Sequence, residues 1–100
     1  MGPVAVTADA FDLATASVRC LVNGEKRQDQ RFTELIFDIP TLIATLSEGI
    51  TLNLGDIIAT GTPAGVGIGH TPPIYLKAGD VVRVEIDGIG ALENRFVERA

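Results

Sequence analysis

Apolar and polar residues alternate from about residue 17 onward, and this is the first clear periodicity in the chain. The apolar positions that would share one side of an extended strand are Val18, Cys20 and Val22. Asn23-Gly24 follows, a dipeptide that tolerates the positive φ angles of a type I′ turn, so the pattern predicts a β-hairpin. The returning arm, residues 25–31, is entirely polar. We expect that arm to be a water-exposed edge or a surface that another part of the protein covers.

A 3.6-residue period replaces the alternation between residues 38 and 50. The apolar positions on one helical face are Ile39, Leu42, Ile43, Leu46 and Ile50. Asp38 is suited to cap the N-terminus, with Pro40 in the first turn. Gly49 is placed to end the helix in the left-handed conformation. The pattern therefore predicts an amphipathic helix of about three turns.

The second half of the chain contains two short segments that are similar in sequence. Residues 52–58 resemble residues 76–82, and each copy predicts a Gly-Asp turn that leads into a strand. The second strand alternates as far as Ile86, and Asp87-Gly88 predicts another hairpin whose return arm covers residues 91–97. The first sixteen residues show no period and predict an opening loop with one short element. The elements together predict a small α+β domain, mainly β with one helix.

The acidic composition of the chain disfavours two classes of binding partner. Asp and Glu outnumber Lys and Arg by 13 to 8, which gives a formal net charge of −5 and a pI near 4.6. The chain has no basic stripe, so nucleic acid and anionic membranes are poor partners. No apolar run approaches the roughly 20 residues that cross a bilayer. We expect a cytoplasmic protein, and 100 residues can form one domain at most.

Residues 61–73 hold the densest glycine and proline stretch and predict a long loop. Its glycines, which either let backbone N–H groups approach an anion or serve backbone geometry alone, are Gly61, Gly65, Gly67 and Gly69. The Gly-Lys pair of a phosphate-binding loop is absent, and the dinucleotide-binding pattern fails because His70 stands where glycine is required. Thr62 adds a hydroxyl at the mouth of the loop.

Other chemistry receives little support from residue types and spacing. His70 is the only imidazole, and no nucleophile or orienting group can be assigned to it from sequence. The acidic residues are scattered without a Glu-x-Glu pair, so their spacing predicts no metal site. Cys20 cannot form an internal disulfide and is expected to be a small apolar side chain.

Residues 57–67, with the sequence IIATGTPAGVG, resemble the signature of the fumarylacetoacetate hydrolase family. Further segments resemble the C-terminal half of that family's catalytic domain in order and spacing: Gly2-Pro3 with 6–9, 22–25 with 27–28, 42–43 through 46–47, 76–77 with 79–82, and 85–86 with 88–90. The resemblance covers essentially the whole chain. It implies a mixed β-roll, usually a homodimer, that acts on small β-diketo or 2-oxo acids with bound Mg²⁺ or Mn²⁺.

The implied reactions are acylpyruvate hydrolysis, oxaloacetate decarboxylation and isomerisation of 2-hydroxyhepta-2,4-diene-1,7-dioate. Each passes through an enolate that a metal ion stabilises. The Gly-Thr-Pro signature puts Thr62 at the substrate, where its hydroxyl or backbone N–H would hold a carboxylate or oxo oxygen, and Gly61 would allow close approach. No other site residue carries over, catalytic or metal-binding.

The family's metal ligands, a Glu-x-Glu pair and a later Asp, and its catalytic Lys belong upstream of the segment that Gly2-Pro3 resembles. The resemblance therefore implies that residues 1–100 are the C-terminal portion of a catalytic domain, inactive alone and with apolar surface exposed. The expected partner is a complementary N-terminal chain or another copy of the protein. The alternative is a non-catalytic β-roll module for binding or oligomerisation that lacks the metal site.

Overall fold

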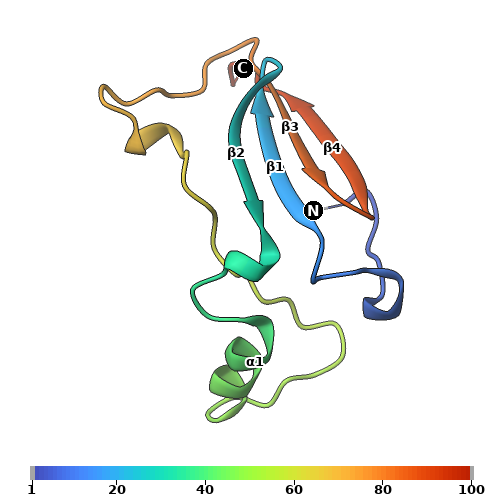
Figure 1. Ribbon diagram of the computed structural model, residues 1–100. Coiled ribbons are helices and arrows are strands. Elements are labelled where there is room, and N and C mark those ends of the chain that lie inside the picture. The colour runs from blue at the N-terminus through green and yellow to red at the C-terminus, as the bar shows by residue number, and fades with distance from the viewer. Residues whose placement is uncertain (1, 100) are drawn as a thin grey trace.

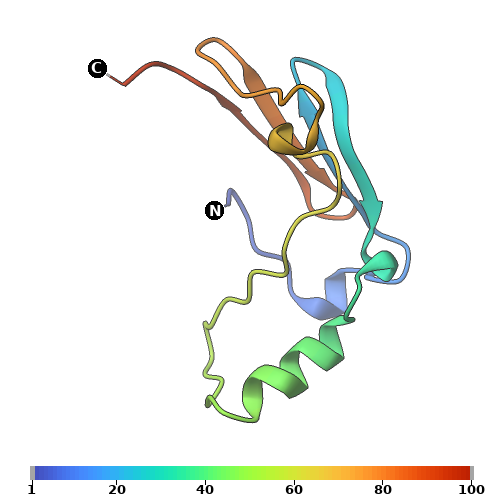
Figure 2. The ribbon, with the colours of Figure 1, turned by 90° about the vertical axis from the view of Figure 1, so that its left-hand side faces the viewer.

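The computed structural model describes residues 2–99, so Met1, where the expected opening loop begins, lies outside the described residues. One antiparallel sheet with the strand order β2-β1-β3-β4 dominates the fold (Figure 1). Its strands are β1 (Ser17–Val22), β2 (Glu25–Arg31), β3 (Val81–Ile86) and β4 (Gly90–Arg95). The one α-helix among the described residues, α1 (Ile39–Ser47), lies beyond one end of the sheet (Figures 1 and 2). The expected class, mainly β with one helix, is confirmed.

Both predicted hairpins are present. Asn23 has a φ of 51° and Gly24 a φ of 80°, as a tight turn between β1 and β2 requires. Gly88 has a φ of 80° in the turn between β3 and β4. The last strand is displaced from its expected range, because it begins at Gly90 and ends at Arg95. The short element of the opening loop is a 3₁₀ turn at Ala8–Ala10.

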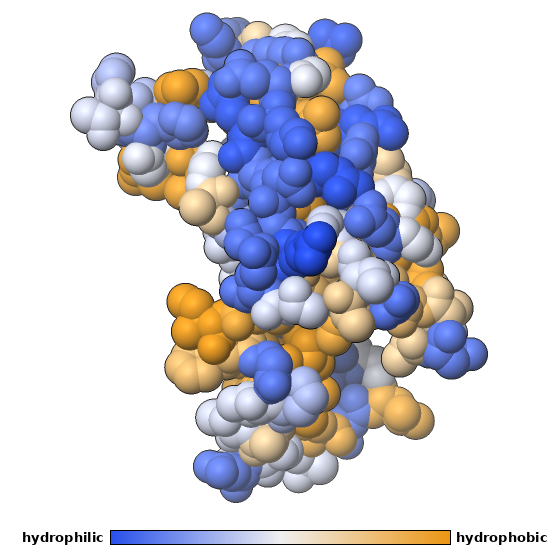
Figure 3. Space-filling model, viewed as in Figure 1, coloured by the Kyte–Doolittle hydropathy of each residue, from blue (hydrophilic) through white to orange (hydrophobic). Residues whose placement is uncertain are grey.

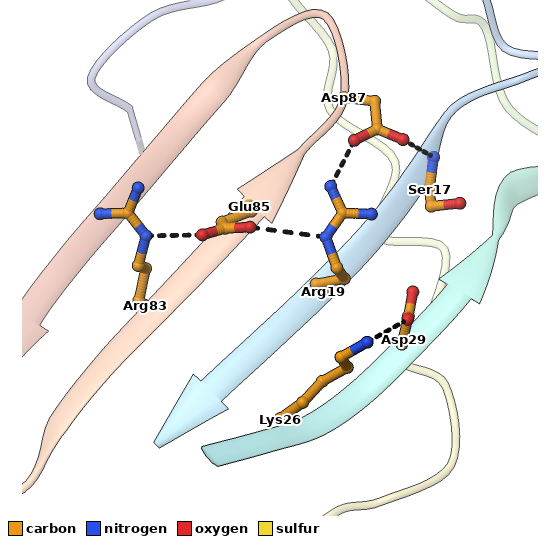
Figure 4. Close-up of polar contacts among 7 residues, drawn as sticks. All are labelled: Ser17, Arg19, Lys26, Asp29, Arg83, Glu85 and Asp87. Carbon is orange, nitrogen blue, oxygen red and sulfur yellow. Dashed lines mark hydrogen bonds and ion pairs between the residues drawn. The ribbon is translucent and has the colours of Figure 1, made fainter. Parts of the chain in front are cut away.

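The two faces of the sheet differ in polarity. Cross-strand pairs on one face are apolar: Val18 with Ile86, Cys20 with Val84, and Val22 with Val82. The opposite face is hydrophilic (Figure 3) and carries a chain of ion pairs (Figure 4). Arg19 Nε lies 3.4 Å from Glu85 Oε2, Arg83 Nε lies 2.7 Å from Glu85 Oε1, and Arg19 also pairs with Asp87. The alternation predicted for these strands is thus confirmed on both faces.

The N-terminus of α1 has the predicted cap. The Asp38 carboxylate accepts a hydrogen bond from the Thr41 backbone N–H at 2.9 Å. Hydrogen bonding from Thr41, by its side chain first and its backbone second, lowers the pKa of Asp38. The prediction for the other end is wrong. Glu48, the C-terminal cap, keeps right-handed helical angles, and Gly49 does not adopt a positive φ. A 3₁₀-type bond from Glu48 N–H to the Thr45 carbonyl closes the last turn instead.

The two similar segments, residues 52–58 and 76–82, form the same kind of turn. Asn53 and Asp56 close a turn in which the Asp56 carboxylate accepts the Asn53 backbone N–H at 2.7 Å. Lys77 and Asp80 close the same turn at 3.0 Å. The intervening glycines, Gly55 and Gly79, have φ values of 91° and 93°.

Only the second copy of this turn leads into a strand, so the strand expected at residues 57–58 is not formed. Ile57 is 69% exposed. Within residues 2–99 no strand lies beside this segment to complete a hydrogen-bonded ladder. An extended segment without a partner strand is not a β-strand, whatever its sequence.

Few side chains of the described residues are buried. Ala16, 3% exposed, is the one buried hydrophobic residue among them, while sixteen large hydrophobic side chains are exposed, Ile36 by 93%. Phe11 and Phe32 form an edge-to-face pair with ring centroids 5.8 Å apart, which joins the opening loop to the end of β2. No helix among the described residues is both long and apolar enough to span a membrane. The expected exposure of apolar surface is therefore present.

Candidate functional site

Gly61 and Thr62 lie on the wall of a hollow of about 540 Å³ between β2, α1 and the glycine loop. The hydrophobic colour gathers over this part of the molecule, below the polar face of the sheet (Figure 3). Large apolar side chains that line the hollow are Val18, Phe32, Leu35, Ile36, Phe37 and Leu42. The Thr62 side chain is exposed there. A hydroxyl on a mostly apolar wall is an arrangement typical of small-molecule sites.

Gly61 meets a conformational requirement. Its φ is 91°, and a Cβ built on it would find no atom within 4 Å. Glycine adopts this region at little cost, whereas other residues are strained in it. The space beside Gly61 is thus open, as the expected close approach of a ligand requires.

Gln28 on β2 holds Thr62 in place, and it is a site residue that sequence reasoning missed. Its Nε2 donates to Thr62 Oγ1 at 2.8 Å and to the Pro63 carbonyl oxygen at 2.7 Å. Gln28 pairs with Cys20 across the ladder, so it stands on the apolar face of the sheet. The sequence carried no signal for this residue, because without a shift in register Gln28 would pair with Arg19 on the polar face.

A β-bulge sets the direction of this side chain. Cys20 pairs with Gln28 and Leu21 pairs with Lys26, so the ladder skips Arg27. Arg27 and Gln28 both line a second cavity of about 700 Å³ between the apolar face of the sheet and the glycine loop. Bulges redirect side chains in this way. The polar arm predicted to be an edge or a covered surface is one of the two edge strands of the sheet, and the glycine loop covers part of it.

Two glycines of the loop serve the packing of the protein itself. A Cβ at Gly65 would lie 1.9 Å from the Arg27 carbonyl oxygen, and one at Gly67 would lie 2.0 Å from that of Ile74. The Gly67 carbonyl also accepts the Ile74 backbone N–H at 2.8 Å. The backbone-geometry interpretation therefore holds at these two positions, while Gly61 remains open toward the hollow.

The opposite end of the loop is fixed to the sheet through Asp80. Its carboxylate accepts a hydrogen bond from the Asn23 side chain at 2.9 Å and from the Lys77 backbone N–H at 3.0 Å. These two bonds, in that order of effect, lower the pKa of Asp80. Asn23 in turn accepts from the Val81 backbone N–H at 2.9 Å. One carboxylate thus joins the first hairpin turn to the start of β3.

His70 and Cys20 take no part in the hollow. His70 Nε2 is enclosed without a hydrogen-bond partner, and the residue is not among those that line the hollow beside Thr62. Cys20 is a half-buried free thiol on the apolar face of the sheet.

The donor groups of this chain do not fit a divalent metal ion. Among residues 2–99, no group of three or more His, Cys, Asp or Glu side chains is close enough to hold one. Carboxylates such as Asp38, Asp80 and Asp87 are occupied by hydrogen bonds within the fold. The described residues thus present the Thr62 hydroxyl to the hollow and contain no group of side chains that could hold a metal ion.

A match to a protein-family model identifies the family of this chain. The sequence model of the family described as "Fumarylacetoacetate (FAA) hydrolase C-terminal" matches residues 1–97. The chain belongs to the fumarylacetoacetate hydrolase family. Similar curated proteins include the oxaloacetate tautomerase YisK of Bacillus subtilis, 51% identical over 97 residues, and the mitochondrial oxaloacetate tautomerase fahd2 of Xenopus laevis, 47% identical over 98 residues.

Solved structures of fumarylacetoacetate hydrolase family proteins share the fold. A fumarylacetoacetate hydrolase from psychrophilic Exiguobacterium antarcticum is 52% identical with a TM-score of 0.93, and 98% of this chain matches 35% of that one. The maleylpyruvate hydrolase of Sphingobium sp. SYK-6, in complex with manganese(II) and pyruvate, is 43% identical with a TM-score of 0.85, and 99% of this chain matches 35% of it.

The match to the curated tautomerases likewise covers nearly all of this chain but only about a third of each relative. It covers 96% of this chain against YisK and 97% against fahd2, but 32% and 31% of those proteins. The chain thus spans about a third of the length of the curated relatives it matches.

Proposed function

We propose that this chain supplies the substrate-oxygen site of an enzyme that acts on small β-diketo or 2-oxo acids. The observation that supports this most directly is the Gly61-Thr62 pair, which presents an oriented hydroxyl to a hollow of about 540 Å³. Relatives about 50% identical are named oxaloacetate tautomerases, and a solved relative is a maleylpyruvate hydrolase that holds pyruvate. Oxaloacetate is therefore the first substrate to test.

The chemistry proposed for Thr62 is the same in each candidate reaction. Tautomerisation, acylpyruvate hydrolysis, oxaloacetate decarboxylation and isomerisation of hydroxydiene dioates all place negative charge on an oxo oxygen. A hydrogen-bond donor fixed beside that oxygen stabilises the charge as it develops. The hydroxyl or backbone N–H of Thr62 would be that donor, and the open space beside Gly61 would admit the substrate.

The proposed cofactor is Mg²⁺ or Mn²⁺, with ligands outside residues 1–100. The manganese complex of the maleylpyruvate hydrolase supports a divalent ion. The described residues of this chain contain no cluster that could hold it. We assign no catalytic residue and no metal ligand to this chain.

The proposed partner is the polypeptide segment that corresponds to the other two thirds of the relatives, within a homo-oligomer. The exposed hydrophobic side chains support a covering partner, because folded proteins rarely leave large contiguous apolar surfaces in water. Residues 1–100 would then form the C-terminal portion of one catalytic domain and would be inactive alone. The cytoplasmic location stays a prediction.

The test is Thr62→Ala in the complete assembly, which is residues 1–100 together with the segment that corresponds to the other two thirds of the relatives. Turnover of oxaloacetate is measured from the absorbance of its enol form. We expect the rate to fall at least about tenfold, since fixed donors at developing charge contribute that much or more. The control is Thr51→Ala, because Thr51 is exposed and lies away from the hollow. Unchanged kinetics in Thr62→Ala would remove Thr62 from the site. Absence of turnover in the unmodified assembly would favour the non-catalytic module.

A further inference from the structure

We propose that Gln28 is a positioning residue that fixes the Thr62 hydroxyl as a donor toward the substrate. The inference rests on the proposed function, and it specifies the polarity of the ligand atom. The ligand atom that meets the Thr62 hydroxyl hydrogen must be a hydrogen-bond acceptor, such as a carboxylate or enolate oxygen.

The argument begins with the two hydrogens of the Gln28 amide. Nε2 lies 2.8 Å from Thr62 Oγ1 and 2.7 Å from the Pro63 carbonyl oxygen. A carbonyl oxygen can only accept, so the amide nitrogen and not the amide oxygen must face Pro63. Both amide hydrogens are then committed, and Thr62 Oγ1 is the acceptor of one of them.

The orientation of the Thr62 hydroxyl follows from this. A hydroxyl carries one hydrogen and two acceptor lone pairs. With one lone pair directed at Gln28, its single hydrogen points away from β2. Thr62 is exposed on the wall of the hollow, so that hydrogen is available to a bound molecule. An unanchored hydroxyl would rotate and present a lone pair as readily as the hydrogen.

The backbone around Gln28 makes the contact rigid. The bulge at Arg27 turns Arg27 and Gln28 toward the same cavity. The loop then approaches β2 so closely that only glycine fits at position 65, where a Cβ would lie 1.9 Å from the Arg27 carbonyl oxygen. Gln28 and Thr62 are therefore held on two backbones in direct contact, and a donor fixed on rigid elements needs little reorganisation during reaction.

Two variants test the proposal in the complete assembly. Gln28→Met keeps the approximate length of the side chain and removes both donors, and Gln28→Glu replaces the amide nitrogen with an acceptor. We expect kcat/KM for oxaloacetate to fall about tenfold or more in each, the scale of a lost positioned donor. Asn94→Asp on β4, at the opposite edge of the sheet, adds a negative charge as Gln28→Glu does, and we expect it to leave kcat/KM within about twofold.

A double-mutant cycle separates positioning from general support of the fold. Thr62→Val keeps the shape of the side chain without the hydroxyl. If Gln28 acts through that hydroxyl, Gln28→Met costs less than about twofold in the Thr62→Val background, because coupled residues are non-additive. An equal loss of activity with and without the Thr62→Val substitution would overturn the proposal and leave Gln28 as a structural residue.

A measurement that does not depend on turnover keeps this outcome distinct from failure of the proposed function. The three-bond NMR coupling between the Thr62 Hβ and hydroxyl protons reports the rotamer about the Cβ–Oγ1 bond, which sets the direction of the hydroxyl hydrogen. We expect a single rotamer with Gln28 and averaging in Gln28→Met. A single unchanged rotamer in Gln28→Met contradicts the positioning role, whatever the activity. An assembly that converts no oxo acid but shows the averaging overturns the proposed function and retains the control of Thr62 by Gln28.

Discussion

Gly65 and the Arg27 carbonyl oxygen approach each other so closely that the glycine has no possible replacement. A Cβ at Gly65 would lie 1.9 Å from that oxygen, and the φ of Gly65 is 109°. This contact seats the glycine loop on the bulge of β2. The position of the Thr62 hydroxyl on the wall of the hollow thus depends on a glycine three residues further along the chain.

We predict that Gly65→Ala displaces the loop from β2. The backbone conformation alone costs about 1–3 kcal/mol for a residue other than glycine, and the clash adds to it. Melting temperature and oxaloacetate turnover should both fall, with the rate reduced at least about tenfold. Gly69→Ala is the matched control, because a Cβ there would meet only a Val66 side-chain atom at 3.6 Å and its φ is not positive. Equal behaviour of the two variants would contradict the close packing at Gly65.

We predict that Asp80 contributes to acid denaturation. Hydrogen bonds from Asn23 and from the Lys77 backbone N–H lower the pKa of Asp80 in the folded state. Its stabilising effect is therefore fully present above the unfolded pKa of about 3.9 and is lost as the pH falls through the lower folded value. Melting temperatures between about pH 3 and pH 7 would show Asp80→Asn melting lower at neutral pH and losing less on acidification.

The equivalent carboxylate of the first turn provides the control for Asp80. The Asp56 carboxylate accepts the Asn53 backbone N–H, as Asp80 accepts that of Lys77. Asp80 also binds the Asn23 side chain of the first hairpin, and Asp56 has no such contact among the described residues, so Asp56→Asn affects the turn alone. We expect a smaller loss of melting temperature in Asp56→Asn. A similar loss in the two variants would show that the contact of Asp80 with the first hairpin contributes nothing measurable.

Metal binding should require polypeptide beyond this chain. Residues 2–99 contain no cluster of three metal-ligating side chains. Mn²⁺ added to residues 1–100 alone should keep the electron paramagnetic resonance signal of the free ion, whereas the complete assembly should bind it and lose activity on treatment with EDTA. Stoichiometric binding by residues 1–100 alone would contradict the assignment of the ligands to another segment.

Exposed apolar surface should make the isolated chain bind a hydrophobic dye. Ile36, Phe37 and Ile57 are exposed by 93%, 62% and 69%. We expect residues 1–100 to enhance the fluorescence of 8-anilinonaphthalene-1-sulfonate several-fold, and the complementary segment to reverse the effect, because such patches are normally covered. Dye binding that the complementary segment leaves unchanged would show that it covers a different surface.

The local sequence determined the elements whose stabilising groups lie within a few residues of one another. Asn23-Gly24 and Asp87-Gly88 predict the two hairpins correctly because a tight turn depends on its own residues: Asn23, Gly24 and Gly88 have the positive φ angles that these turns use. Asp38 predicts the start of α1 because the hydrogen bond that it accepts spans three residues. Gly49 failed as a helix terminator because a 3₁₀-type bond at Glu48 satisfied the same requirement.

The candidate site was predicted only in part. The resemblance of residues 57–67 to a family signature indicated Thr62 and Gly61, and the structure brings both to one hollow. It could not indicate which loop glycines face the protein and which face the hollow. That distinction depends on whether another backbone lies opposite, as Arg27 does for Gly65 and as nothing does for Gly61.

Sequence by itself thus determined the sheet-forming alternation, the helix cap and the paired Gly-Asp turns, since each depends on neighbours along the chain. Only the tertiary structure decided that Gln28 meets Thr62 across 34 residues, because the bulge at Arg27 changes which face of β2 the side chain takes. It also decided that residues 57–58 form no strand. Strand formation requires a second backbone to complete the hydrogen bonds, and a single chain segment does not encode where that backbone lies.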